Sequence, residues 1–466
     1  MAAGVAPGKR VIVPFGKQKV YSALIKNIIH EHTSPESLKE IHSVLDDAPL
    51  VNEFQFKLWE WMSEYYMCSQ GEVMNSALPS ALKLASETKV ILSPDADLES
   101  EDLNANEELL IAALSKSHEL TISEIAGLLK KSSVHQILKK AVEKKLIIIS
   151  EEINARYKPK LEARLRLAEV YKSDSEMENL FLQLEEDQRK KKQQEALMIF
   201  LKYLYEESNR DSIKKNLVTS HPDISKSSLQ TLISNGILIE FHVQVDRIPD
   251  ASDDVVPPAP LSGIQLKALQ EIKTSYEKHD VTLLHGVTSS GKTELYIHLI
   301  EEAVQAGKQV LYLLPEIALT TQMITRLQKH FGKSVGVYHS RYTGNERVEV
   351  WNHVLNFRSD VNGKQSQIIL GARSSLFLPY SNLGLIIVDE EHDSSYKQND
   401  PAPRYNGRDT AMVLAKIHGA KTLLGSATPA LESYYNAEHD RYGKVELNER
   451  HGGVEMPAIV VADMAE

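Results

Sequence analysis

The sequence predicts a multidomain α/β protein, on three observations. A glycine-rich loop at residues 286–293 follows a short apolar run and opens a helix-forming segment. A second apolar run, residues 383–388, ends in the acidic pair Asp389–Glu390. Continuous apolar runs of this kind are typical of strands buried on both faces of a parallel sheet. We therefore predict a RecA-like parallel-sheet lobe over residues 261–446, in a chain long enough for about three domains.

The loop at residues 286–293, GVTSSGKT, has the GxxxxGKT spacing of a phosphate-binding P-loop. Its backbone N–H groups and the helix N-terminus after it can cradle phosphates. Lys292 would reach the β- and γ-phosphates of ATP, and the Thr293 hydroxyl would ligate Mg²⁺. A glycine-rich turn without a ligand is the alternative, which the flanking strand and helix disfavour. The predicted nucleotide contacts here are Gly286, Val287, Thr288, Ser289, Ser290, Gly291, Lys292, Thr293 and Glu294.

Asp389 and Glu390 stand at the carboxyl end of their predicted strand, where open α/β sheets bind ligands. Asp389 would hold Mg²⁺ through water, and Glu390 would polarise the attacking water as general base. By itself, an acidic pair after a strand is as often part of an ordinary loop as part of a catalytic site. Because this pair follows a P-loop, we predict that Lys292, Asp389 and Glu390 are catalytic in ATP hydrolysis.

A third motif, Ser426-Ala427-Thr428, follows another apolar run. A P-loop, an Asp-Glu-x-His box and a downstream Ser-Ala-Thr resemble the superfamily 2 helicases. By that resemblance, Ser426, Ala427, Thr428 and His392 would couple the state of the nucleotide to the DNA path.

Further stretches narrow the resemblance to one family. They are residues 314–322, His339–Ser340, Glu346–Arg347 with Trp351, 371–377, 389–398 and 403–409. These stretches resemble the PriA family of replication-restart helicases, also called primosomal protein N′, whose members usually carry Ala at Gly407. The resemblance covers about residues 9–85 and 261–466. It implies an ATP-dependent 3′-to-5′ DNA helicase that acts in primosome assembly and replication restart at stalled forks.

The same resemblance assigns roles to single residues. Gln265 would read the adenine edge, for which an amide is chemically suited. The loop from Tyr396 to Tyr405 would couple DNA contact to hydrolysis, with rings stacking on bases and cations pairing with phosphates. A proline-bent surface loop is the alternative. The predicted DNA contacts are Gly16, Lys39, Arg373, Tyr396, Lys397, Arg404 and Tyr405.

Residues 1–85 resemble the family's DNA 3′-end-binding domain. Its first strand, which carries an acidic residue of the 3′-end pocket, would be missing here, so we expect this domain to be incomplete. The first thirty residues carry no acidic side chain, and their basic residues could face a phosphate backbone. A lysine-edged, solvated strand is an equal alternative. These basic residues are Lys9, Arg10, Lys17, Lys19 and Lys26.

The middle of the chain predicts two helical modules. Residues 104–155 have the helix, helix, β-ribbon order of a winged helix, and its second helix would be the recognition element if it bound DNA. Residues 156–249 form a helical module that is a possible second winged helix. Winged helices also serve as spacers or protein docks, so DNA reading by either stays open. Residues 250–260 are acidic and proline-rich, which predicts a semi-rigid linker.

The formal net charge of −11 argues against a uniformly basic nucleic-acid coat, so DNA contact must be local. No apolar stretch is long enough to span a membrane, and the single cysteine, Cys68, suits a reducing cytoplasm. The resemblance implies single-stranded and forked DNA, single-stranded-DNA-binding protein and primosome proteins as partners.

Residues 447–466 would begin a linker to a second helicase lobe, to which the resemblance assigns both a zinc-binding cysteine cluster and an arginine finger. We accordingly expect zinc only in that further part, a truncated chain, and little ATP turnover by the chain alone. A DNA- and ATP-binding fragment without independent turnover, or another superfamily 2 translocase, are the alternative functions.

Overall fold

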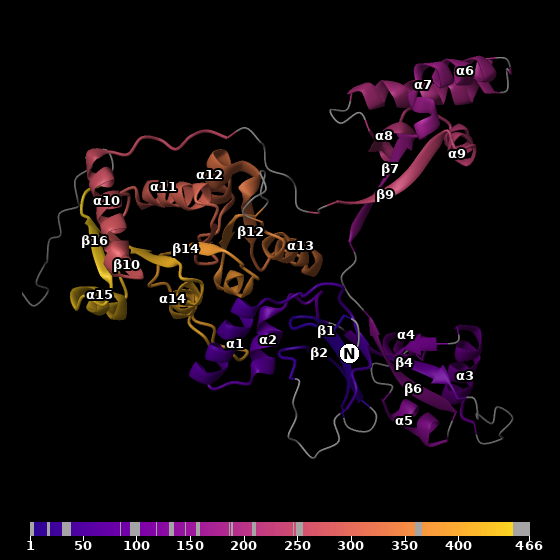
Figure 1. Cartoon of the computed structure of the whole chain (residues 1–466). Coiled ribbons are helices and arrows are strands. Elements are labelled where there is room, and N and C mark those ends of the chain that lie inside the picture. Colours follow the sequence, from indigo (N-terminus) through magenta and orange to yellow (C-terminus); the bar gives the residue numbers. More distant parts are fainter. Residues whose placement is uncertain are drawn as a thin grey trace, which may run out of the picture. The chain divides into compact units, whose positions relative to one another are not determined.

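A computed structural model describes most of the 466-residue chain, which falls into two compact units (Figure 1). One unit holds residues 1–157 and 250–466, and the other holds residues 158–249. Within the described ranges, no helix is long and apolar enough to cross a bilayer. The described residues are 4–15, 19–29, 39–83, 85–93, 103–117, 119–129, 135–144, 146–154, 159–185, 187, 190–206, 211–245, 247, 255–358 and 366–450.

The N-terminal residues form a small antiparallel sheet followed by two helices. The sheet has the order β2-β1-β3. Each helix starts with a capping box, Asn52 with Gln55 and Ser69 with Glu72, which satisfies N–H groups at the helix start. The small, mainly-β N-terminal domain that the family resemblance implies for residues 1–85 is confirmed in its three-stranded sheet, to which α1 and α2 are added. Its elements are β1 (Arg10–Phe15), β2 (Lys19–Leu24), β3 (Ser43–Val44), α1 (Glu53–Tyr65) and α2 (Gln70–Ala77).

The next module is a winged helix built on the antiparallel sheet β5-β4-β6. Leu110, Leu114 and Ile125 lie in its buried core. Its first strand pairs along its whole length with β6, so the module extends upstream of the predicted start at residue 104. Its elements are β4 (Ala85–Leu92), α3 (Ala105–Ser117), β5 (Glu119–Thr121), α4 (Ile122–Leu128), α5 (His135–Glu143) and β6 (Ile147–Asn154).

The second unit has the same helix-and-ribbon organisation around the sheet β8-β7-β9. Phe200 and Leu232 are fully buried in its core. The possible second winged helix of residues 156–249 is therefore present in this unit. Its elements are β7 (Lys160–Leu167), η1 (Glu169–Lys172), α6 (Asp174–Glu185), α7 (Lys191–Glu206), β8 (Ile213–Lys214), α8 (Lys215–Thr219), α9 (Lys226–Ser234) and β9 (Leu238–Val245).

The C-terminal part is the predicted parallel-sheet lobe. Its seven strands have the order β12-β13-β11-β14-β15-β10-β16, and every neighbouring pair is parallel. The strands are β10 (Val281–Gly286), β11 (Gln309–Leu313), β12 (Val335–Tyr338), β13 (Ile368–Gly371), β14 (Leu383–Asp389), β15 (Lys421–Ser426) and β16 (Gly443–Leu447). The helices are α10 (Gly263–Lys278), α11 (Lys292–Gln305), α12 (Thr321–Phe331), η3 (Gly332–Ser334), α13 (Gly344–Leu355), η4 (Arg373–Phe377), η5 (Ser394–Tyr396), α14 (Gly407–His418) and α15 (Leu431–Glu438).

Two ends of the lobe were expected to be linkers. The C-terminal part of residues 250–260 is bound to the lobe, since the Val256 N–H donates to the Lys329 carbonyl at 2.8 Å. This end of the predicted linker is therefore fixed in place. Residues 451–466, most of the other predicted linker, lie outside the described residues.

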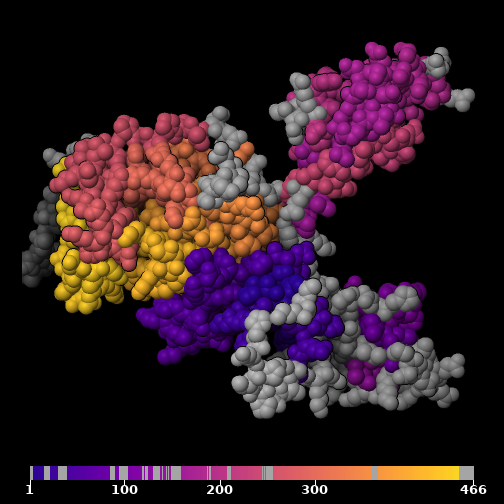
Figure 2. All heavy atoms as spheres, in the orientation of Figure 1, coloured from indigo at the N-terminus to yellow at the C-terminus, as the bar shows by residue number. Residues whose placement is uncertain are grey.

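Helix α1 packs directly on the lobe, an interface that the sequence did not reveal. The Gln55 side-chain amide donates to the Phe377 carbonyl at 2.7 Å, and the Trp351 indole donates to the Leu50 carbonyl at 3.1 Å. Both bonds are buried, and Figure 2 shows the indigo atoms of this segment in contact with the lobe. Because buried polar groups need partners, these bonds fix how the two domains meet.

Candidate nucleotide and nucleic-acid sites

The order of the central strands brings the three motifs together. Strands β14, β15 and β10 are adjacent and parallel, so their carboxyl ends meet at one edge of the sheet. The P-loop follows β10, Asp389 ends β14 and Ser426 ends β15. These motifs, separated in sequence, become neighbours only through this topology.

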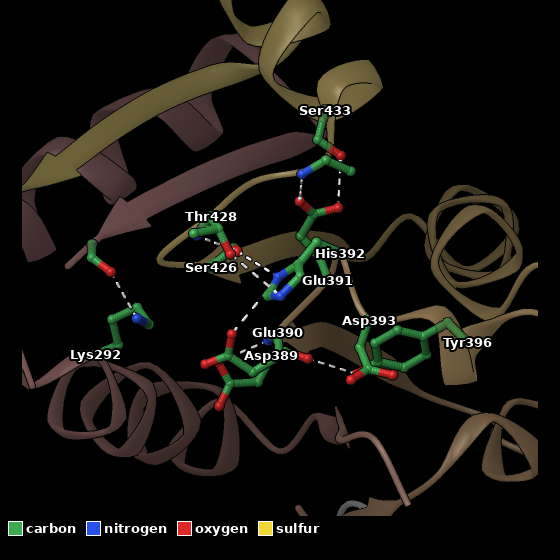
Figure 3. A network of polar contacts seen from close by, with 12 residues as sticks. Lys292, Asp389, Glu390, Glu391, His392, Asp393, Tyr396, Ser426, Thr428 and Ser433 are labelled. Carbon is green, nitrogen blue, oxygen red and sulfur yellow. Dashed lines mark hydrogen bonds and ion pairs between the residues drawn. The ribbon is translucent and has the colours of Figure 1, made fainter. Parts of the chain in front are cut away.

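The P-loop has the compact backbone that a phosphate cradle needs. Gly291 is the N-cap of α11 in the left-handed region, with φ of 84°. A Cβ on Gly286 would lie 2.9 Å from Ser290 Oγ and 3.1 Å from Lys292 Cγ, so only glycine fits without a shift. Lys292 Nζ donates to the Gly286 carbonyl at 2.8 Å, which holds the ammonium over the loop (Figure 3).

A cavity of about 440 Å³ lies between the P-loop and the acidic box. Lys292, Asp389 and Glu390, the three predicted catalytic residues, all line it. Arg326 from α12 lines it too, although the sequence did not single it out. Gly286 and Val287 are not in its lining, which consists of residues 288–294, Arg326, Asp389 and Glu390.

Asp389 is held by two buried tyrosines. Tyr296 Oη donates to its Oδ1 at 2.9 Å, and Tyr312 Oη donates to its Oδ2 at 3.1 Å. Burial raises the pKa of Asp389, and the bond from Tyr296 opposes that rise. Sequence reasoning missed both tyrosines. A tyrosine between two leucines in the buried strand QVLYL was the available signal, because a buried phenol needs a hydrogen-bond partner.

Next to the cavity, His392 joins the acidic box to the Ser-Ala-Thr motif (Figure 3). Its Nδ1 lies 2.8 Å from Ser426 Oγ and its Nε2 lies 3.3 Å from Thr428 Oγ1. Glu390 Oε2 lies 3.7 Å from the same Nδ1, and Glu390 itself has φ of 47°. A bulky residue rarely adopts this backbone region, and such conformations concentrate at functional sites. Of the predicted coupling residues, Ala427 adds no side-chain bond to this network.

Glu391, the residue before His392, forms a buried ion pair with Arg408. Its Oε2 is 3.1 Å from Arg408 Nη1, and the two side chains are 0% and 11% exposed. Its carboxylate also accepts from the Ala430 N–H at 2.7 Å and from Ser433 Oγ at 2.8 Å. In the sequence, Glu391 and Arg408 are only members of the stretches 389–398 and 403–409 that resemble the PriA family. The sequence does not predict the contact between them.

Gln265 lies against the P-loop and does not line the cavity. Its Oε1 accepts from the Ser262 N–H at 2.9 Å in a capping box, and its Nε2 is 3.5 Å from the Gly291 carbonyl. The side chain is buried. Contact with adenine therefore stays a prediction.

The two tyrosines predicted to stack on bases are turned inward. Tyr396 and Tyr405 are only 2% and 1% exposed. Tyr396 Oη donates to the Asp389 carbonyl at 2.7 Å, and the Tyr405 ring packs edge-on against Phe377. The stacking role does not agree with this structure, because neither ring has a face open to a base.

The predicted basic DNA contacts divide into bound and exposed groups. Arg373 Nη1 donates to the carbonyls of Ser395 and Lys397 at 2.6 and 2.9 Å, so it holds the loop in place. Lys397 and Arg404 are exposed, although Lys397 Nζ donates to the Arg404 carbonyl at 2.7 Å and Arg404 pairs with Asp400 at 3.4 Å. Phosphate contact by this loop stays a prediction, and its exposed candidates are Lys397 and Arg404.

The basic N-terminal cluster is largely used within its own domain. Lys9 is buried and donates to the Asp47 carbonyl, while Arg10 pairs with Asp46 at 2.6 Å. These two residues fit neither a phosphate-facing patch nor a solvated edge. Lys39 is exposed, whereas Gly16 and Lys17 lie outside the described residues.

Four family models match successive stretches of the chain. They are the 3′DNA-binding domain (3′BD) of PriA over residues 1–79, a winged helix domain over 87–152, the winged helix domain of PriA helicase from Bacteroidota over 162–245, and the DEAD/DEAH box helicase over 262–437. The replication restart protein PriA of Bacillus subtilis (strain 168) is 32% identical over 468 residues, which cover 99% of this chain. Along almost its whole length, this chain is therefore similar to proteins of the PriA family.

PriA proteins from other organisms are similar to this chain as well. That of Haemophilus influenzae is 30% identical over 96% of this chain and 49% of its own length, and that of Chlamydia trachomatis is 44% identical over 44% of this chain and 27% of its own. The alignment covers 54% of the Bacillus protein, so the chain spans about half the length of the curated relatives that it matches throughout. Among solved structures, the DUF1998 helicase MrfA overlays at a TM-score of 0.29 and 17% identity, covering 40% of this chain and 30% of that one, a likeness too weak to inform the fold.

Proposed function

We propose that this chain is a member of the PriA family and carries the nucleotide- and DNA-binding part of an ATP-dependent 3′-to-5′ DNA helicase. The helicase would act in primosome assembly and replication restart at stalled forks. The observation that carries the proposal is the meeting of Lys292, Asp389 and Glu390 on one cavity, beside the His392–Ser426 contact. A cavity lined by P-loop N–H groups and carboxylates suits a Mg²⁺-bound triphosphate.

Each lining residue has a role that its position supports. The Lys292 ammonium would pair with the terminal phosphates, and Thr293 with Asp389 would hold Mg²⁺. When bound, that cation would neutralise charge that develops on the phosphates. Glu390 would accept a proton from the attacking water, since its carboxylate is partly exposed beside the P-loop. His392 would pass a change at Glu390 to Ser426 and Thr428 through the contacts already described.

Single-stranded and forked DNA would bind through local basic groups, because the chain is acidic overall. Lys397 and Arg404 are the exposed cations of the loop that ends beside Asp389. Single-stranded-DNA-binding protein and primosome proteins as partners, a cytoplasmic location, and zinc bound outside residues 1–466 rest on the family resemblance alone.

Single-turnover hydrolysis of bound ATP tests the proposal. We expect residues 1–466 to hydrolyse Mg·ATP very slowly, with little stimulation by forked DNA, because the family's arginine finger is expected in the second helicase lobe. Glu390→Gln should slow that step by at least about 10²-fold, the usual contribution of a general base, while ATP stays bound. Glu271→Gln, a partly exposed carboxylate on α10 outside the cavity, is the matched control. Equal rates for the wild type and Glu390→Gln would favour a binding fragment without independent turnover.

A further inference from the structure

Arg326, on helix α12, lines the nucleotide cavity together with the P-loop and the acidic box. Its guanidinium pairs with the carboxylate of Glu294, the residue that directly follows Lys292 and Thr293. The two side chains are 41% and 27% exposed, and both line the same cavity as Glu390. Through Glu294, the P-loop helix therefore holds a second cation on the cavity that Lys292 also lines.

The charges around this cavity leave a role for that cation. Three carboxylates line it, those of Glu294, Asp389 and Glu390, against two cations, Lys292 and Arg326. Burial raises the pKa of Tyr312, which bonds to Asp389, and the charge of Arg326 opposes that rise, so this charge acts at the acidic end of the cavity. A bound triphosphate would add further negative charge, which a lysine alone would balance poorly.

The chemistry of the guanidinium suits the same role. It has five N–H donors in a planar fork, and Glu294 cannot occupy all of them. Arginine pairs with phosphate through two parallel hydrogen bonds, which makes it selective for that group. The other arginines near the motifs are engaged elsewhere: Arg408 is buried with Glu391, and Arg404 pairs with Asp400. Neither of them lines the cavity.

We propose that Arg326 donates to the terminal phosphate of bound ATP and lets this site distinguish a triphosphate from a diphosphate. Glu294 orients the guanidinium from the P-loop helix. The inference rests on the proposed function, because it takes the cavity to be the ATP site. A purely structural bridge between α11 and α12 is the competing explanation, and an exposed ion pair of that kind contributes little to stability.

Equilibrium binding of the whole chain to a labelled non-hydrolysable ATP analogue and to labelled ADP, each with Mg²⁺, tests the inference. Arg326→Ala should weaken binding of the ATP analogue by about 10-fold or more, the usual effect of losing a hydrogen bond to a charged group. Binding of ADP should change by less than about twofold, because the missing contact is to the third phosphate. Arg326→Lys should fall between the wild type and Arg326→Ala, since a point charge replaces the fork. Lys329→Ala, which removes an exposed cation from the same helix outside the cavity, should change neither affinity.

Retained ADP binding by Arg326→Ala shows that the pocket is folded. Equal losses for the two nucleotides, or no loss for either, would overturn the inference and leave the proposed function standing. Failure of the wild-type chain to bind either nucleotide would remove the proposed function, and this inference with it.

Discussion

The nucleotide cavity and the loop of residues 396–405 both depend on polar and charged side chains. These side chains line open space in the cavity, whereas those that hold the loop turn inward. On the cavity side, Lys292, Asp389 and Glu390 line an open pocket. On the loop side, Arg373 and Tyr396 turn inward and donate to backbone carbonyls. A residue type thus predicts its chemistry well where the backbone directs the side chain outward, as at the end of a parallel strand. Within a loop that folds on itself, the residue type does not predict which side chains face solvent.

The loop nevertheless touches the cavity through one shared residue. The carboxylate of Asp389 lines the cavity, and its backbone carbonyl accepts from Tyr396 Oη at 2.7 Å. The loop is closed on itself as well, because Gln398 Nε2 donates to the carbonyls of Pro401 and Pro403 at 2.9 Å each. A rigid loop fixed to Asp389 offers a mechanical route between DNA contact and the nucleotide, without base stacking by its tyrosines.

The largest expected effect is on stability at the buried pair. Glu391→Ala removes the charge that pairs with Arg408 and the acceptor of the Ala430 N–H. We expect the free energy of unfolding to fall by about 3–5 kcal/mol in urea denaturation, as when one partner of a buried pair is lost. Glu432→Ala, 74% exposed and 4.0 Å from Arg408, should cost less than about 1 kcal/mol. Similar losses for both would mean that the loop side is not fixed by buried charge.

A smaller, pH-dependent effect should come from His418, which stacks on Phe54 at 4.1 Å between centroids. Burial, with a minor contribution from Lys57, lowers the pKa of His418 to about 4. The unfolded chain has the ordinary histidine pKa of about 6.5, so between these values only the unfolded state binds the proton. Stability should therefore fall as the pH drops from about 6.5 to about 4, by at most about 3 kcal/mol.

His418→Phe checks this, because it keeps a stacked ring that cannot titrate. Urea denaturation at several pH values should show a shallower loss for His418→Phe than for the wild type. His439→Phe, which replaces an exposed ring stacked on Tyr435, is the matched control. Parallel curves for the wild type and His418→Phe would rule out His418 as the source.

The smallest expected effect separates the exposed and buried members of the loop. Arg404→Ala, at a side chain 66% exposed, should lower the salt slope of single-stranded DNA binding by about 0.7 and weaken affinity about fivefold at 0.1 M salt. Tyr405→Leu should change DNA affinity by less than about twofold, whereas loss of a stacked ring costs about 1–3 kcal/mol. A larger loss for Tyr405→Leu than for Arg404→Ala would show that the loop opens to DNA and would break the contrast drawn here.

The sequence predicted the parts that rest on local patterns. The apolar strands with polar carboxyl ends, the P-loop turn at Gly291 and the order helix, helix, ribbon each leave a periodic or positional signal. Parallel topology then brings the ends of β10, β14 and β15 together, so the sequence could predict that Lys292 and Asp389 line one site.

The remainder depends on contacts that no local pattern encodes. Tyr312 meets Asp389 across 77 residues, and Gln55 meets Phe377 across 322. The inward turn of Tyr405 arises because its ring packs on Phe377, which a count of aromatic residues in the loop does not predict. The sequence therefore indicated which loop to examine for DNA contact, but not which of its side chains face solvent.

The measurement that tests the central claim most directly is equilibrium binding of a labelled Mg·ATP analogue to residues 1–466 and to Lys292→Ala. Lys292 lines the cavity, and the claim is that its ammonium pairs with the terminal phosphates there. We predict at least about 10-fold weaker binding by Lys292→Ala, the usual effect of losing a hydrogen bond to a charged group. Lys267→Ala, 79% exposed on α10 and equal in charge change, should bind like the wild type. Equal affinity of the wild type and Lys292→Ala would contradict the assignment of this cavity as the ATP site.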